Sequence, residues 1–137
     1  MAKESGLGMT VTVDDSTGSG QAISNDVTSV GITMPSGVQD VTGVNSSGME
    51  RLLLLADLSV SLSGVFNDAA NLSHAVLKNY RTLAASQVGR TTAIAISGQT
   101  LSDEILYANY DLNRAADGSL TWSSSGSLSD GGVPAWS

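Results

Sequence analysis

The sequence predicts a mainly β domain of about seven strands with one flanking α-helix, a β-sandwich or barrel-like fold. Most apolar residues recur at every second position, which is the pattern of a strand with one buried face. Turn signals separate these segments at intervals of about 8–12 residues, as in sandwiches and barrels. A chain of 137 residues has the length of one domain, and we expect residues 1–137 to form it.

The first three predicted strands precede a long polar stretch. Met9–Val13 and Gln21–Ile23 flank Asp14–Gly20, whose Asp, Ser and Gly residues favour a hairpin turn. Val30–Met34 is the third strand, with Ser29, Gly31 and Thr33 on its opposite face. Pro35–Glu50 has no strand pattern and is expected to be a long loop. Unstructured loops above about 12–15 residues are uncommon and tend to be functional or disordered.

The longest alternating segment, Leu52–Leu62, is predicted to be a single strand. Its even-numbered residues are apolar and serines separate the later ones, so one face should be buried and the other hydroxyl-rich. Leu52–Leu55 places leucines on both faces, and this end should therefore be covered by something else.

The remaining pattern is one helix followed by three strands. Leu72, Val76, Tyr80 and Leu83 lie at helical spacing, and Asn71 or Ser73 could supply the N-cap. The last three strands are predicted at Thr92–Ile96, Leu106–Leu112 and Leu120–Leu128, with a hairpin turn at Asp117-Gly118. Trp122 is expected in the core.

Composition excludes several classes of function. The net charge is -7, with only 6 Lys and Arg residues, which argues against a nucleic-acid-binding surface. There is no cysteine, so disulfides and thiolate sites are excluded. His74 is the only histidine and is expected to be an exposed helix residue. Asp14/Asp15 and Asp103/Glu104 are adjacent carboxylates that point to opposite strand faces. We therefore expect no enzyme, no cofactor and no metal site.

Self-association follows from the same composition. Charged residues are 14 % and aromatic residues 4 % of the chain, so the core must be built from Leu, Val and Ile. A small domain of this kind is marginally stable alone, and burial against copies of itself is a natural remedy. No signal peptide or membrane-spanning segment is expected, so we predict synthesis in the cytoplasm and no membrane partner.

Five stretches resemble the major tail (tail tube) proteins of long-tailed bacteriophages that infect actinobacteria. These are AKESGLG at the N-terminus, NDVTSV at Asn25–Val30, VQDVTGVNSSGMERLLLLADLSVSLSGVFN at Val38–Asn67, SHAVLK at Ser73–Lys78, and SLTWSSSGSLSDGGVPAW near the C-terminus. They cover nearly the whole chain in the family's order. None is a catalytic motif, so the resemblance depends on their collinearity.

The resemblance implies a structural protein of the virion, made in the host bacterial cytoplasm. Hexameric rings would stack into a tube, with other tail proteins at its ends, and phage DNA would pass through during ejection. One sheet of each subunit would join an inner barrel with an acidic, hydroxyl-lined lumen. Candidate lumen residues are Ser29, Thr33, Asp57, Ser59 and Ser61.

The long loop is the candidate for ring-to-ring stacking. Its apolar residues could be buried against an adjacent ring, and a cation at its exit could pair with a neighbour's carboxylate. The residues concerned are Val38, Val41, Val44, Met49 and Arg51.

The alternative is a β-sandwich binding or adhesion module that recognises a host surface or a carbohydrate. Such modules usually present aromatic side chains or a metal at loop tips. Only Trp136 is expected on a loop here. A small hydrolase is a more distant third hypothesis.

Overall fold

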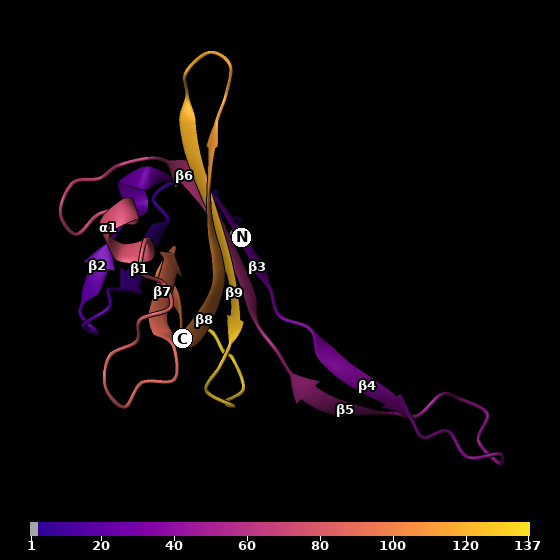
Figure 1. The fold of residues 1–137 in the computed structure, drawn as a ribbon. Helices are drawn as coiled ribbons and strands as arrows, with labels where there is room; N and C mark the ends of the chain where they lie inside the picture. Colours follow the sequence, from indigo (N-terminus) through magenta and orange to yellow (C-terminus); the bar gives the residue numbers. More distant parts are fainter. Residues whose placement is uncertain (1–2) are drawn as a thin grey trace.

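The computed structural model describes residues 3–137 and confirms a mainly β fold with one short helix (Figure 1). Nine strands are present in this part of the chain, two more than predicted. They are β1 (Thr10–Asp14), β2 (Gly20–Ala22), β3 (Val27–Thr33), β4 (Ser36–Asp40), β5 (Arg51–Ala56), β6 (Ser59–Val65), β7 (Arg90–Ile96), β8 (Gln99–Arg114) and β9 (Leu120–Leu128). A 3₁₀ turn, η1 (Ser24–Asp26), precedes β3, and the helix α1 (Ser73–Leu77) lies between β6 and β7.

Seven strands form one antiparallel sheet in the order β2-β1-β7-β8-β9-β6-β3. The connection from β2 through η1 to β3, which is the last strand on the other side of the sheet, is held against β1, because the Val11 amide donates to the Ser24 hydroxyl (2.9 Å) and the Ile23 amide donates to the Val11 carbonyl (3.0 Å). The sheet therefore curls around its own apolar face, and α1 packs over that face (Figure 1). Such closure is a common solution for a sheet that lacks a second layer.

The core is aliphatic apart from two aromatic side chains. Trp122 is buried as predicted, and its indole N–H donates to the Val65 carbonyl (2.9 Å). Tyr107 is buried with its hydroxyl 2.7 Å from that of Thr92, and burial raises its pKa to about 12. The aliphatic members are Val11, Val13, Ile23, Leu58, Val60, Leu62, Val76, Leu77, Ile94, Leu101 and Ile105.

Both predicted tight turns are confirmed. In the β1–β2 turn, Asp15 accepts hydrogen bonds from Thr17 and from the Ser19 amide, which lower its pKa to about 2. In the β8–β9 turn, Gly118 has φ +94 and the Ala115 amide donates to the Ser119 carbonyl (2.9 Å). The second hairpin extends well beyond the body of the molecule (Figure 1).

The predicted loop 35–50 and the predicted single strand 52–62 are wrong in detail. Residues 36–40 form β4, which pairs with β5, so the loop itself spans only residues 41–50. The strand is interrupted at Asp57 and Leu58, where the chain bends from β5 into β6. Figure 1 shows β4 and β5 as an arm that projects from the sheet. Leu52 and Leu54, expected to be buried, are exposed because no second layer covers the arm.

The helix is shorter than its spacing predicts and is capped differently. It spans only Ser73–Leu77, and no side chain caps it from Asn71 or Ser73. Instead the buried Asp26 carboxylate, from η1, accepts from the Ser73 amide (3.2 Å) and from the Asn67 side chain (3.0 Å). The acceptor for the first-turn amide of the helix is therefore distant in sequence, so the local sequence pattern does not reveal it.

Arg90 holds the segment after α1 against the sheet. Arg90 is 1 % exposed, and its guanidinium donates to the carbonyls of Val76, Asn79 (2.6 Å) and Thr82 (3.0 Å). These bonds draw carbonyls at and beyond the helix end around a single cation. Burial lowers the pKa of Arg90, and the charges of Asp15, Tyr107 and Asp14 oppose that effect.

Candidate functional site

One face of the sheet is lined by hydroxyl groups over β3, β6 and β9, and β8 completes it with Leu106, Asn109 and Asp111. It is the face opposite the apolar core, and its residues align in rows across the four strands. The rows, read from β3 to β8, are Thr33–Ser59–Ser127–Leu106, Gly31–Ser61–Ser125–Asn109 and Ser29–Ser63–Ser123–Asp111. We call these twelve residues the polar face.

The polar face is hollowed along its middle. Two adjoining hollows of about 190 and 200 Å³ share Ser61 and Ser125 among their lining residues. Gly31 leaves room for its neighbour, because a Cβ there would lie 2.6 Å from the Ser61 hydroxyl. A bulge in β8 between Tyr107 and Asn109 increases the local twist. The result is a concave surface of hydroxyl and amide groups.

The polar face carries little charge of either sign. Asp111 is its single carboxylate, and no Lys or Arg is among the twelve residues. The acidic residues of the chain lie mainly elsewhere, at turns such as Asp15 and Asp117. This face is therefore hydroxyl-lined as expected, and its acidity depends on Asp111.

The structure brings together four of the five candidate lumen residues. Ser29, Thr33, Ser59 and Ser61 lie on the polar face. Asp57 lies apart, at the bend between β5 and β6, where its carboxylate accepts from the Leu58 amide (2.7 Å). The equally large contribution of β9 was missed, although Ser123, Ser125 and Ser127 alternate with buried residues in the sequence.

The arm, defined as residues 34–56, exposes an unusual amount of apolar surface. Leu53 is 75 % and Leu55 90 % exposed, and Leu52 and Leu54 are exposed on the opposite face of β5. The predicted stacking residues Val38, Val41, Val44 and Met49 are exposed here too. An exposed apolar patch of this extent is typical of a protein interface.

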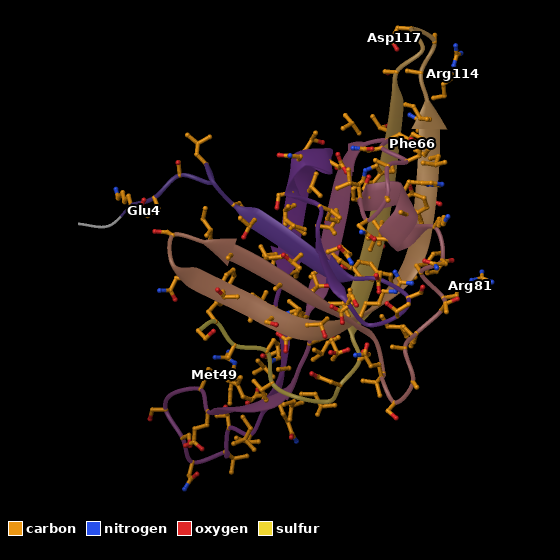
Figure 2. All side chains as sticks on the ribbon, turned by 90° about the vertical axis from the view of Figure 1, so that its left-hand side faces the viewer. Glu4, Met49, Phe66, Arg81, Arg114 and Asp117 are labelled. Carbon is orange, nitrogen blue, oxygen red and sulfur yellow. The ribbon has the colours of Figure 1, made fainter. Side chains whose placement is uncertain are left out.

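The tip of the arm is held by its own hydrogen bonds. The Glu50 amide donates to the Thr42 hydroxyl (2.8 Å), the Thr42 hydroxyl donates to Asp40 (2.6 Å), and the Val41 amide donates to the Glu50 carbonyl (2.9 Å). Arg51 is exposed at the start of β5, opposite Asp40. In Figure 2 Met49 on the arm and Asp117 on the β8–β9 hairpin lie at opposite ends of the molecule.

The described residues offer no cluster of three His, Asp or Glu side chains that could hold a metal ion. His74 is half-buried rather than exposed, because its ring packs 4.7 Å from that of Phe66 and its Nδ1 lies 3.0 Å from the Tyr110 hydroxyl. No helix within residues 3–137 has both the length and the apolarity to cross a membrane.

Comparison with known proteins gives a fold but no family. No family model and no curated protein matches the sequence. Solved structures do match: a chain from the virion of a native gene transfer agent (GTA) particle has a TM-score of 0.73 at 17% identity, with 98% of this chain and 99% of that chain covered.

A chain from the tail of an empty GTA particle, with C6 symmetry, also has a TM-score of 0.73, at 18% identity and the same coverage. At this identity the likeness shows that the two share a fold over nearly their whole lengths.

Proposed function

We propose that this protein is a structural subunit of a phage-like tail tube, without enzymatic activity. It would form hexameric rings that stack around a channel and reside in the virion, with other tail proteins at the ends of the tube. The observation that carries the proposal is the concave polar face, in a chain whose fold matches one from a C6-symmetric tail. The sequence resemblance also leads us to propose that the tail belongs to a phage that infects actinobacteria.

The chemistry of the polar face suits a channel for DNA. Affinity for a phosphate backbone comes mainly from Lys and Arg, which release counterions on binding. The polar face consists mainly of hydroxyl groups, with one carboxylate per subunit, Asp111, and it contains no such cation. DNA would therefore pass without being retained. Ser29, Thr33, Ser59 and Ser61 are proposed to face the lumen, and Asp57 is not.

The arm is proposed to join one ring to the next. Val38, Val41, Val44 and Met49, with the leucines of β5, would be buried against an adjacent ring, and Arg51 would pair with a neighbour's carboxylate. Burial of exposed apolar area is the main driving force of such association. Because the arm and the β8–β9 hairpin lie at opposite ends of the molecule (Figure 2), each could meet a different neighbouring ring.

Electron microscopy of the concentrated protein tests the proposal. Rings with six-fold symmetry, alone or stacked into tubes, support it. A monodisperse monomer at every concentration would refute it and would favour the binding-module alternative. The described residues give that alternative one exposed aromatic near the C-terminus, Trp136, which is 40 % exposed and whose backbone forms a β-bridge with Leu101, and they hold no cluster of ligands for a metal ion.

A further inference from the structure

The arm is joined to the main sheet by two short linkers. Within residues 3–137, β4 and β5 pair with each other and with none of the seven strands of the main sheet. Met34-Pro35 connects β3 to β4, and Asp57-Leu58 connects β5 to β6. We call these four residues the hinge. Because the arm projects from the sheet beyond the hinge (Figure 1), its direction depends on the backbone conformation there.

The hinge interrupts a pairing that is regular on both sides of it. On the side of the main sheet Thr33 lies opposite Ser59, and on the side of the arm Ser36 lies opposite Ala56. Between these two pairs, both chains leave the strand conformation for two residues. A bend in both strands at the same position is where a sheet can turn into a second sheet of different orientation.

Asp57 forms hydrogen bonds to both sides of the hinge. Its amide donates to the Pro35 carbonyl (2.9 Å), and its carboxylate accepts from the Leu58 amide (2.7 Å). Leu58 is buried in the core, and its carbonyl accepts from the Leu128 amide (2.8 Å). Within residues 3–137, no hydrogen bond other than that of the Asp57 amide joins the two linkers. Asp57 therefore connects the base of the arm to the core.

The two linkers are restricted in different ways. Proline fixes its own φ near −65° and disfavours helical conformation in the residue before it, so Pro35 restricts the first linker. The second linker contains no proline, and there the Asp57 carboxylate holds the following amide instead. Asp57 is exposed, and its carboxylate bonds to no other group of the described residues. Its structural effect is therefore confined to the hinge.

A fixed hinge would strengthen the contact that the arm makes. The arm exposes its leucines on both faces of β5, so no packing against the main sheet holds them in place. A segment that moves freely must be immobilised when it binds, and this weakens binding, whereas a segment that is already oriented avoids the loss. This step rests on the proposed function, in which the arm contacts an adjacent ring.

We propose that Asp57 is a positioning residue that fixes the angle between the arm and the main sheet in the free subunit. The sequence predicts this aspartate in the lumen, but its carboxylate acts at the hinge. It would contribute to stacking through the direction of the arm, without itself contacting the next ring.

Spin labels on introduced cysteines test the proposal, because the chain has no cysteine of its own. Gln39→Cys on β4 and Ser102→Cys on β8 provide exposed positions on the arm and on the main sheet. Double electron–electron resonance on dilute subunits should give one narrow distribution of label distances. Adding Asp57→Ala removes the acceptor of the Leu58 amide and should broaden this distribution at least twofold.

Two further variants make the test specific for the carboxylate oxygen. Asp57→Asn keeps an oxygen that can accept from the Leu58 amide, and should retain the narrow distribution. Asp68→Ala is the matched control, because Asp68 is also exposed but lies between β6 and α1, outside the hinge. A distribution as narrow for Asp57→Ala as for Asp68→Ala would overturn the proposal. So would an Asp57→Asn distribution as broad as that of Asp57→Ala, or a broad distribution without any change at Asp57.

Stacking provides a second readout. Asp57→Ala should leave rings intact and raise the concentration needed for tubes by about tenfold, since each arm must then be oriented on binding. Asp57→Asn and Asp68→Ala should form tubes as the unmodified protein does. Equal tube formation by Asp57→Ala and Asp68→Ala would contradict a contribution of the hinge to stacking.

The outcomes separate the hinge from the proposed function. Absence of rings and tubes from the unmodified protein at every concentration would overturn the proposed function. The label distances are measured on single subunits, so they decide the role of Asp57 in either case. Thermal unfolding of dilute Asp57→Ala should match that of Asp68→Ala, and a much lower melting temperature would show that Asp57 supports the whole fold and would overturn its assignment to the hinge.

Discussion

Replacing Leu53 and Leu55 by serine should abolish stacking without weakening the folded subunit. Both side chains extend from the arm into solvent, at 75 % and 90 % exposed, so the isolated chain gains almost nothing from them. Burying a leucine completely stabilises by about 1.5–3 kcal/mol, so their burial between rings is worth roughly 2.5–5 kcal/mol per subunit. Six copies acting together would lose roughly 15–30 kcal/mol per ring-to-ring contact, before the costs of association are subtracted.

Two measurements on the same sample check this prediction. Sedimentation velocity and electron microscopy should show single rings in place of tubes. Thermal unfolding of dilute subunits should change by no more than about 0.5 kcal/mol, as is usual for surface substitutions. Val133→Ser is the matched control, because Val133 is 79 % exposed but belongs to the C-terminal segment and not to residues 34–56. Tubes of ordinary length from the double variant would refute the role given to the arm.

Four further predictions follow from the geometry. Ser127→Lys on the polar face should make assembled tubes retain double-stranded DNA at low salt in a co-sedimentation assay, whereas Asn25→Lys outside it should not; equal retention would argue against the lumen assignment. Arg90→Met should lower the free energy of unfolding by about 3–5 kcal/mol in urea titration, because several buried carbonyls lose their donor; a loss under about 1 kcal/mol would show that Arg90 is not needed. The ionised Asp15 carboxylate, with its pKa lowered to about 2 from 3.8, stabilises the fold fully above pH 3.8 and loses this effect as the pH falls toward 2. Asp15→Asn should therefore remove part of the acid dependence of the melting temperature, and an unchanged pH profile would contradict that assignment. Replacing residues 42–49 by Asn-Gly should leave subunits that fold and form rings but stack poorly. Tubes of ordinary length from this variant would show that stacking depends on the β5 leucines and not on the loop.

The strands of the curled sheet could be predicted because they have a core to face. Alternation in β6 and β9 arises from one buried and one solvent face, and the sequence shows it directly as Val60 and Leu62 between serines. The Asp-Gly turn before β9 was predictable for the same local reason. The hydroxyl-rich character of the polar face was therefore available from the sequence.

The arm could not be predicted in the same way, because it has no core of its own. β4 contains one apolar residue, Val38, and β5 exposes leucines on both faces, so neither has the period of a half-buried strand. The alternation of leucines continued through Asp57 and concealed the bend there. Both strands owe their form to pairing with each other, which a one-dimensional pattern does not reveal.

The end of α1 and the unpaired part of β8 depend on contacts distant in sequence. Helical spacing extends to Leu83, but the Arg90 guanidinium binds the carbonyls of Asn79 and Thr82 and holds this segment out of helical conformation. β7 begins at Arg90, opposite Ile105, so residues 106–114 of β8 pair only with β9. These features follow from tertiary structure, not from local propensity.

Cryo-electron microscopy of the assembled protein tests the central claim most directly. We predict six-fold rings in which β3, β6, β9 and β8 of each subunit surround a channel, with Ser61 and Ser125 facing its axis. A sheet oriented with these serines on the outer surface, or the absence of any ring or tube, would contradict it.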